Sequence, residues 1–215
     1  MLKRVVLMVF ALALAAASTA MADQSPTYAG KLSPVEVAFV RSIQVDLMKR
    51  FPTAADAEKA GYVRYTNADS TGAISYANRQ WQSPDARHPS QLWYDKAGQL
   101  LGADFSVLKT GEQRPSIFGV NPGRLYQFDD HVHYVAKNAT TGAMQYDKYV
   151  MAPAFRKGGG DPQHPTAADL VKMGKVANAN EVATVFDMPS IWDLIVWVKP
   201  NPSGAFAEKN PLVKP

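Results

Sequence analysis

The chain has 215 residues, no cysteine and a formal net charge of +4, and 47% of its residues are hydrophobic. Without cysteine, thiol catalysis, iron–sulfur ligation and disulfide bonds are excluded. Lysine and arginine are scattered along the sequence, so no basic patch for nucleic acid is expected.

The first residues have the pattern of a secretory signal peptide. Lys3 and Arg4 precede an apolar run over residues 5–17, and Ala20-Met21-Ala22 supplies the small-residue motif before a cleavage site. A membrane anchor is the alternative, but the run is shorter than the ~20 residues that a span needs. We therefore expect residues 1–22 to be removed, with no stable membrane anchor left. Export without disulfides is typical of a periplasmic or secreted bacterial protein.

Cleavage also changes the charge. Loss of the two basic leader residues leaves 21 lysines and arginines against 19 acidic residues, a net charge of +2. We expect residues 23–215 to form a single domain, because a chain of this length can bury most of its unfolded surface in one core.

Two helices are predicted at the start of this domain. Ser33, Pro34 and Glu36 have the spacing of an N-cap with a capping box, and apolar residues follow at helical spacing until Pro52. Residues 53–61 have a second cap and end at a glycine, which predicts a short helix.

The rest of the chain alternates with period two between turn-forming residues. Strands are predicted at residues 62–66, 74–81, 92–94, 99–107, 125–136, 144–151, 182–186 and 191–198, with a short helix at 166–175 and an irregular tail from about 200 to 215. This order predicts an α+β domain in which N-terminal helices pack against a curved, mainly antiparallel β-sheet.

Three blocks of sequence carry a resemblance. Residues 72–78 (GAISYAN), 88–95 (HPSQLWYD) and 197–206 (WVKPNPSGAF) resemble a loosely defined group of small exported bacterial proteins with no assigned activity. The resemblance spans most of the mature chain and implies a shared architecture, but no reaction. Some members have a histidine near the position of Ile195, and its absence here weakens a three-histidine metal site.

Residues 125–151 are predicted to form a hairpin that holds two of the four histidines. Alternation places His131 and His133 together on the more polar face of the first strand, while Val132 and Tyr134 face the core. Residues 137–142 are rich in turn formers. If Ala136 lies opposite Met144, then His133 faces Asp147 and His131 faces Tyr149, and a one-residue slip would abolish that pairing.

The His-x-His pair is the sharpest chemical signal. Two imidazoles two residues apart on a strand can bind one metal ion, and Asp147, His164 or Asp193 could supply a third ligand, as in a zinc site. Met144 and Met151 raise copper as a variant, although methionine more often fills a core. The alternative interpretation is two surface histidines that titrate in water.

Asp193 interrupts an otherwise apolar last strand, IWDLIVWV, which should be a central strand. A buried carboxylate there predicts either an acid/base group with a raised pKa or a structural partner such as Arg124 or Arg156.

Three functional hypotheses follow. The leading one is a small ligand or a metal ion, zinc or copper, bound in a pocket of the sheet near His131, His133, Asp147, Tyr149 and Asp193. The second is a hydrolase or lyase that uses His133 with Asp147 or Asp193 as an acid/base pair. The third is an interaction protein with no small-molecule site. No serine-hydrolase elbow, zinc-protease motif, phosphate loop or dinucleotide fingerprint is found.

Overall fold

The structure is a computed structural model that describes residues 24–81 and 84–214. The expected signal peptide and its cleavage site lie outside these residues. The helices are α1 (Pro34–Arg50), α2 (Ala54–Lys59), α3 (Ala152–Lys157) and α4 (Ala167–Lys172). The strands are β1 (Val63–Arg64), β2 (Ile74–Ala77), β3 (Gln91–Tyr94), β4 (Leu100–Leu108), β5 (Tyr126–Phe128), β6 (His131–Lys137), β7 (Met144–Met151), β8 (Val182–Met188) and β9 (Ile191–Trp197). None of the described helices is long and apolar enough to cross a membrane.

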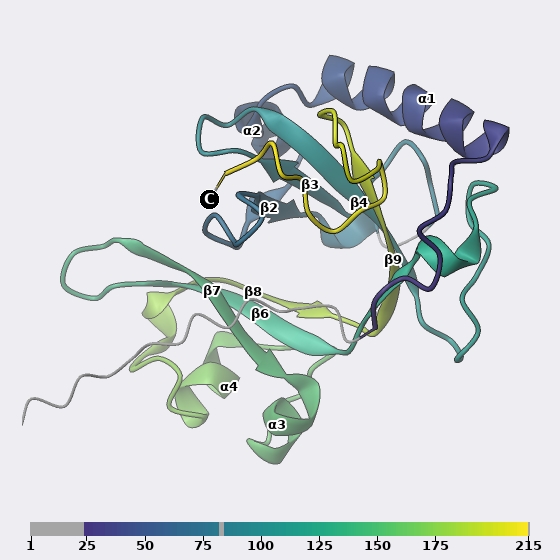
Figure 1. The fold of residues 1–215 in the computed structure, drawn as a ribbon. Helices are drawn as coiled ribbons and strands as arrows, with labels where there is room; N and C mark the ends of the chain where they lie inside the picture. Colours follow the sequence, from purple (N-terminus) through teal and green to yellow (C-terminus); the bar gives the residue numbers. More distant parts are fainter. Residues whose placement is uncertain (1–23, 82–83, 215) are drawn as a thin grey trace, which may run out of the picture.

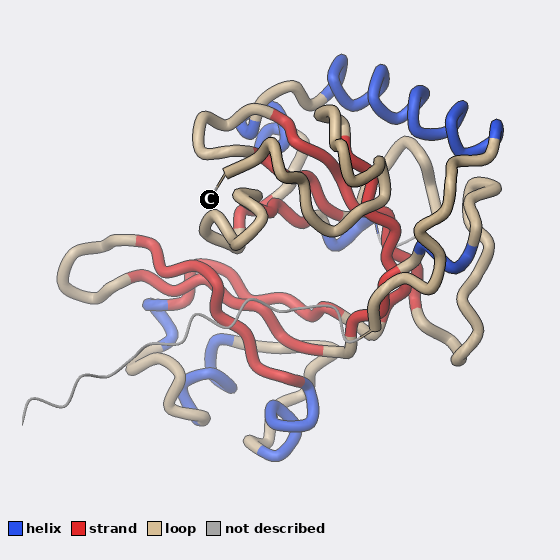
Figure 2. Tube along the Cα trace, in the orientation of Figure 1, coloured by secondary structure: helices blue, strands red, loops and turns tan. Residues whose placement is uncertain are grey.

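The strands form two antiparallel sheets. The larger has the order β1-β2-β3-β4-β9-β5, and the smaller has the order β7-β6-β8. They appear as an upper and a lower layer in Figures 1 and 2. The α+β class is therefore as predicted, but the expected single curved sheet is wrong, because among the described strands β6, β7 and β8 form a separate sheet.

The smaller sheet is an insertion into the larger one. β5 pairs directly with β9, with Phe128 opposite Ile191, so the chain leaves the larger sheet after β5 and returns at β9. Residues 129–190 between them form the smaller sheet together with α3 and α4. The backbone N–H of Asp130 donates to the hydroxyl of Ser190 at 3.1 Å, which holds the two ends of the insertion together.

Alternation along the strands gives each sheet two different faces. One face of the larger sheet shares a buried cluster with α1, including Phe39, Ile43, Leu92 and Phe105. The outer face of the smaller sheet shares a second cluster with α3 and α4, built from Val132, Tyr134, Ala136, Val150, Phe155 and Leu170. The two remaining faces point toward each other across the space between the layers.

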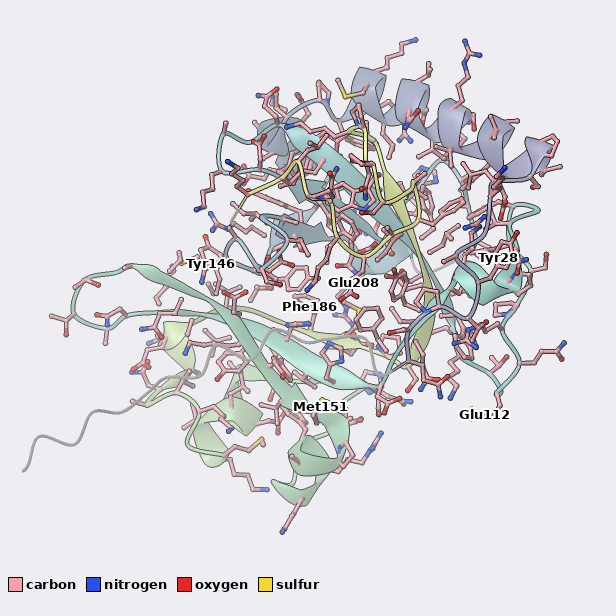
Figure 3. All side chains as sticks on the ribbon, in the orientation of Figure 1. Tyr28, Glu112, Tyr146, Met151, Phe186 and Glu208 are labelled. Carbon is pink, nitrogen blue, oxygen red and sulfur yellow. The ribbon has the colours of Figure 1, made fainter. Side chains whose placement is uncertain are left out.

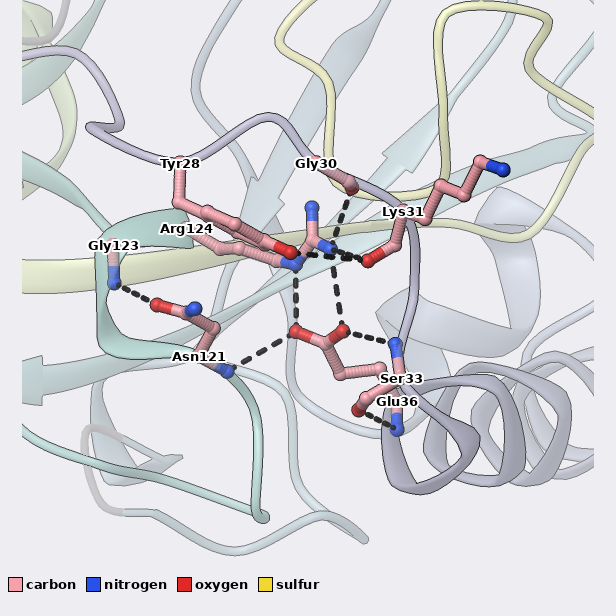
Figure 4. Close-up of polar contacts among 8 residues, drawn as sticks. All are labelled: Tyr28, Gly30, Lys31, Ser33, Glu36, Asn121, Gly123 and Arg124. Carbon is pink, nitrogen blue, oxygen red and sulfur yellow. Dashed lines mark hydrogen bonds and ion pairs between the residues drawn. The ribbon is translucent and has the colours of Figure 1, made fainter.

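The start of α1 is held by a buried ion pair (Figure 4). Ser33 and Glu36 form the predicted capping box, and the Glu36 carboxylate also accepts a hydrogen bond from Arg124 Nε at 2.6 Å. Burial alone would raise the pKa of Glu36, but hydrogen bonds from Arg124 and from backbone N–H groups outweigh it and lower the pKa to about 2. The carboxylate therefore joins α1 to the turn at Pro122–Arg124 (η2).

The C-terminal tail after β9 has no helix or strand in its described part, as predicted. The indole N–H of Trp197 donates to the carbonyl of Ala207 at 2.6 Å, and the Asn201 amide donates to the carbonyl of Lys209 at 3.0 Å. These bonds fold the tail back over the larger sheet and bring Glu208 to the space between the layers (Figure 3).

Candidate functional site

A cavity of about 200 Å³ lies between the facing surfaces of the two sheets. Its walls combine aromatic and apolar side chains with polar groups from β3, β4, β6 and β7, and the tail contributes to its rim. Its aromatic, apolar and uncharged polar lining residues include Tyr65, Gln91, Trp93, Tyr126, Phe128, His131, His133, Tyr149, Met188 and Ile195. Its acidic and basic lining residues are Asp69, Asp104, Asp147, Glu208 and Lys209. A cavity of this size accommodates a small organic molecule.

His131 and His133 project together from β6 into this space, as alternation predicts. Their Nε2 atoms are 3.0 Å apart, and Nδ1 of His131 lies 2.6 Å from the carbonyl oxygen of Asp129. A carbonyl can only accept, so His131 Nδ1 carries a hydrogen. In a neutral pair, His131 Nε2 then accepts the hydrogen bond that His133 Nε2 donates.

His133 is enclosed by rings. It stacks on Phe186 at a centroid distance of 5.5 Å, and it lies 4.6 Å from Tyr65 and 5.9 Å from Tyr149. Burial and, secondly, the imidazole of His131 lower the pKa of His133 well below its usual range, against an opposite effect of the Lys148 backbone. The alternative interpretation of two surface histidines is therefore wrong, since each histidine is only 5% exposed.

The opposite wall is built around Asp104 on β4. Its side chain is 3% exposed, and Oδ2 accepts a hydrogen bond from the Trp93 indole at 2.9 Å. Oδ1 has no hydrogen-bond partner among the described residues. Burial, reinforced by the charge of Asp193, raises the pKa of Asp104 well above its usual range, and the bond from Trp93 offsets this only in part.

Asp193 lies beside Asp104, on the same face of the neighbouring strand β9. It is 1% exposed and pairs in register with Ser106, whose hydroxyl donates to Asp193 Oδ1 at 2.7 Å. Burial raises the pKa of Asp193 to about 7 despite that bond. The expected partners are wrong, because Arg124 pairs with Glu36 and Arg156 pairs with Asp130.

Tyr65 connects the two walls. Its hydroxyl donates to the side-chain oxygen of Gln91, which is the cross-strand neighbour of Asp104, and its ring contacts His133. Sequence reasoning missed Tyr65, Gln91, Trp93 and Asp104. A signal for Asp104 was available, because it interrupts the apolar strand LLGADFSVL as Asp193 interrupts its own strand.

The expected hairpin register is wrong. Ala136 lies opposite Gln145, His133 opposite Tyr149 and His131 opposite Met151, with an irregularity near Ala136. Asp147 has a positive φ of 59°, and its carboxylate accepts two bonds from the Asn67 backbone N–H at 3.0 Å and one from the Asn67 amide at 2.6 Å. Asp147 therefore lies on the cavity surface, but it binds Asn67 and does not face His133.

The expected third metal ligands lie elsewhere. His164 is in the loop between α3 and α4, beyond the outer face of the smaller sheet, where its side chain is 82% exposed and pairs with Asp161. Met144 and Met151 are exposed, whereas Met188 on β8 lines the cavity. No group of three histidine, aspartate or glutamate side chains suited to a metal ion occurs in the described part of the chain.

Comparison of the chain with protein-family models, with curated proteins and with solved structures finds no match. One wall of the cavity holds two buried imidazoles, the other holds a buried carboxyl group with an unmet acceptor, and aromatic rings lie between them.

Proposed function

We propose that this chain is an exported protein that binds a small molecule in the cavity between its two sheets. The observation that carries the proposal is Asp104, a buried carboxyl group on the cavity wall whose Oδ1 has no partner among the described residues. Burying a polar group without a hydrogen bond costs about 1–3 kcal/mol. Such a group is therefore expected where a ligand completes its hydrogen bonds.

The surrounding residues support the same function. Ligand cavities are mostly apolar, with a few polar groups that fix the orientation of the ligand. Trp93, Tyr126 and Ile195 supply apolar surface here, while Gln91 and the histidine pair supply hydrogen-bonding groups. Zinc or copper is the less supported ligand, because the histidine pair offers two nitrogen ligands and a protein zinc site needs three or four.

A cavity-filling variant tests the proposal. Ile195→Phe adds volume inside the cavity, and Val45→Phe makes a similar change on the solvent side of α1, where Val45 is 66% exposed. The mature protein is purified from its native compartment, retained molecules are identified by native mass spectrometry, and a panel of small molecules is tested by thermal shift. A ligand that raises the melting temperature of the wild type and of Val45→Phe, but not of Ile195→Phe, supports binding in the cavity.

Two outcomes contradict the proposal. Equal stabilisation of both phenylalanine variants places the ligand outside the cavity. If no retained molecule is found and no member of the panel stabilises the wild type, the interaction-protein hypothesis is favoured instead.

An acid/base enzyme is the second candidate. It is favoured by the perturbed pKa values of His133 and Asp104 on the cavity walls and of Asp193 buried beside Asp104, because such shifts cluster at active sites. Asp147 is not hydrogen-bonded to His133, so the expected His133–Asp147 dyad is replaced here by the histidine pair.

Turnover assays separate this candidate from simple binding. If the wild type hydrolyses or eliminates a cavity ligand, His133→Gln should lower kcat by about 10²- to 10⁴-fold, as expected for loss of general acid/base catalysis. Full recovery of the unchanged ligand after incubation with the wild type supports a binding protein.

Export is proposed from the leader pattern. Cleavage after Ala22 predicts that the exported protein begins at Asp23, which the intact mass of protein from the periplasm or medium would show. An intact mass that retains Met1 to Ala22 would contradict the proposed processing.

A further inference from the structure

We propose that the ligand of this cavity is a small organic cation, an amine or ammonium compound with an apolar or aromatic body, held with its charge against Asp104. This inference rests on the proposed small-molecule function and names the chemical class of the ligand. It follows from the charges, the unmet acceptor and the rings of the cavity.

The charged groups of the cavity are unbalanced. The cavity is lined by four residues with carboxyl groups, Asp69, Asp104, Asp147 and Glu208. Lys209 on the tail is the one lysine or arginine among its lining residues. Within residues 24–81 and 84–214, none of these four carboxyl groups forms an ion pair. An anionic ligand would therefore meet like charge and little compensation, whereas a cation would be attracted.

Asp104 gives this negative cavity a defined anchoring point. Trp93 fixes Oδ2, so the carboxyl group is held in one orientation and Oδ1 remains available to a donor. A buried carboxylate is stable only when it is paired, hydrogen-bonded or protonated. Burial raises the pKa of Asp104 and so favours its protonated form when no cation is bound, and an ammonium N–H donor would stabilise the carboxylate instead, with the proton released to solvent.

The rings around Asp104 suit the rest of such a ligand. Trp93, Tyr126, Phe128 and Tyr65 all line the cavity, and the faces of aromatic rings attract cations, tryptophan most strongly. The volume of about 200 Å³ limits the ligand to a small molecule. A neutral molecule could use the same apolar surface, but it would leave the charge of the cavity without a partner.

A matched ligand series tests the inference on the full mature protein. Two sets each have one body and three head groups: phenethylamine, phenethyl alcohol and phenylacetate form the first, and butylamine, butanol and butyrate form the second. A third set pairs choline with its uncharged isostere 3,3-dimethylbutanol. Binding is measured by calorimetry and thermal shift at pH 7.5. We expect the cations to bind at least about tenfold more tightly than their neutral or anionic counterparts: the primary amines through a charge-assisted hydrogen bond to Asp104, and choline, which has no N–H, through its charge and the aromatic rings.

Asp104→Asn assigns the charge preference to one residue. This variant keeps the shape of the side chain, and we expect it to lower cation affinity about 10- to 100-fold while changing the affinity of the neutral compounds little. Asp161→Asn is the matched control, because Asp161 is exposed in the loop between α3 and α4 and should leave every affinity unchanged. Circular dichroism of Asp104→Asn confirms that it is folded.

The outcomes separate this inference from the proposed function. If neutral or anionic compounds bind as well as the cations, and Ile195→Phe abolishes their binding, the ligand class is wrong while small-molecule binding stands. If Asp104→Asn prefers cations as strongly as the wild type does, Asp104 is not the residue that binds the charge of the ligand. If no compound of any charge binds and no molecule is retained from the native source, both proposals fail.

Discussion

Two carboxyl groups, Asp104 on β4 and Asp193 on β9, become buried side by side when the chain folds. Asp104 accepts a hydrogen bond from Trp93 and Asp193 accepts one from Ser106, and neither forms an ion pair with a residue that the structure describes. Burial raises both pKa values, and the charge of Asp193 raises that of Asp104 further. The buried carboxyl groups are therefore more stable protonated than charged. The folded protein should therefore bind more protons than the unfolded chain above about pH 4.

This difference predicts how two amide variants respond to pH. Because the folded pKa values are raised, the stability from these groups is full below the unfolded pKa and is lost as pH rises through the folded value. Asp104→Asn and Asp193→Asn remove that loss, so each should be more stable than the wild type at pH 8. The gain should shrink toward pH 4, with a slope of up to about 1.4 kcal/mol per pH unit for each proton.

Urea unfolding from pH 4 to 9 measures this effect. His133 changes stability in the opposite direction below pH 6.5, because its folded pKa is lowered, so the comparison is between each variant and the wild type at every pH. Parallel curves for the wild type and both variants would show that neither carboxyl group takes up a proton on folding.

The sequence identified one of these two residues. Asp193 stands out because every neighbour in IWDLIVWV is apolar, and the structure buries it as that pattern indicates. Asp104 is less conspicuous in the sequence, because its strand also contains the non-apolar residues Gly102 and Ser106, so the aspartate does not interrupt a continuous apolar run. Their position beside each other depends on the pairing of β4 with β9, which lie far apart in the chain, and alternation within one strand cannot predict it.

Among the helices and strands, the capping predicted from neighbouring residues is confirmed, whereas the pairing predicted between distant segments is wrong. The capping box at Ser33 and Glu36 involves neighbours in sequence, and α1 begins where it predicts. The run from residue 125 to 136 looked like one strand, but it divides at Asp129 and Asp130 into β5 and β6, which belong to different sheets. Tyr126 accordingly lines the cavity and does not share a core with Val132.

Asp147 explains why the hairpin register differs from the expectation. Its positive φ introduces an irregularity into β7, and its carboxylate and backbone N–H both bind the segment after β1, where the N–H donates to the carbonyl of Tyr65 at 3.0 Å. The guanidinium group of Arg64 lies over the ring of Tyr146, 4.1 Å from its centroid, beside this contact. The irregularity at Asp147 therefore bonds the insertion to the segment that follows β1 of the larger sheet.

Three substitutions at Asp147 separate backbone strain from hydrogen bonding. Asp147→Gly keeps the positive φ but loses the carboxylate, whereas Asp147→Ala loses the carboxylate and strains the backbone. We expect Ala to cost about 1–2 kcal/mol more than Gly, and Asn to cost least, since it tolerates this conformation and can still accept from Asn67. Free energies of unfolding in urea measure the series. Equal losses for Ala and Gly would contradict a strained position.

At the scale of the whole molecule, the cavity exists because residues 129–190 fold back over one face of the larger sheet (Figures 1 and 2). The insertion could not be predicted, because β5 and β9 flank it as ordinary strands and only their mutual pairing reveals it. Its apolar contact with the larger sheet includes a small cluster with Tyr65, Phe186, Met188 and Ile191, beside the hydrogen bonds of Asp147 and an ion pair between Arg79 and Asp187. The two layers are therefore held together mainly around the cavity.

Two phenylalanines of the insertion test that arrangement, because they are both buried but belong to different clusters. Phe186 contacts Tyr65 and His133 between the layers (Figure 3), whereas Phe155 packs with Leu170 on the outer face of the smaller sheet. Truncation of either to alanine should cost about 3–5 kcal/mol. Phe186→Ala should also accelerate hydrogen exchange in residues 63–66 and in β6, because it loosens the contact between layers. Phe155→Ala should accelerate exchange in α3 and α4 and leave residues 63–66 close to the wild type. If both variants accelerate exchange in the same peptides, the insertion and the larger sheet open as one cooperative unit. The two layers would then not separate at the cavity.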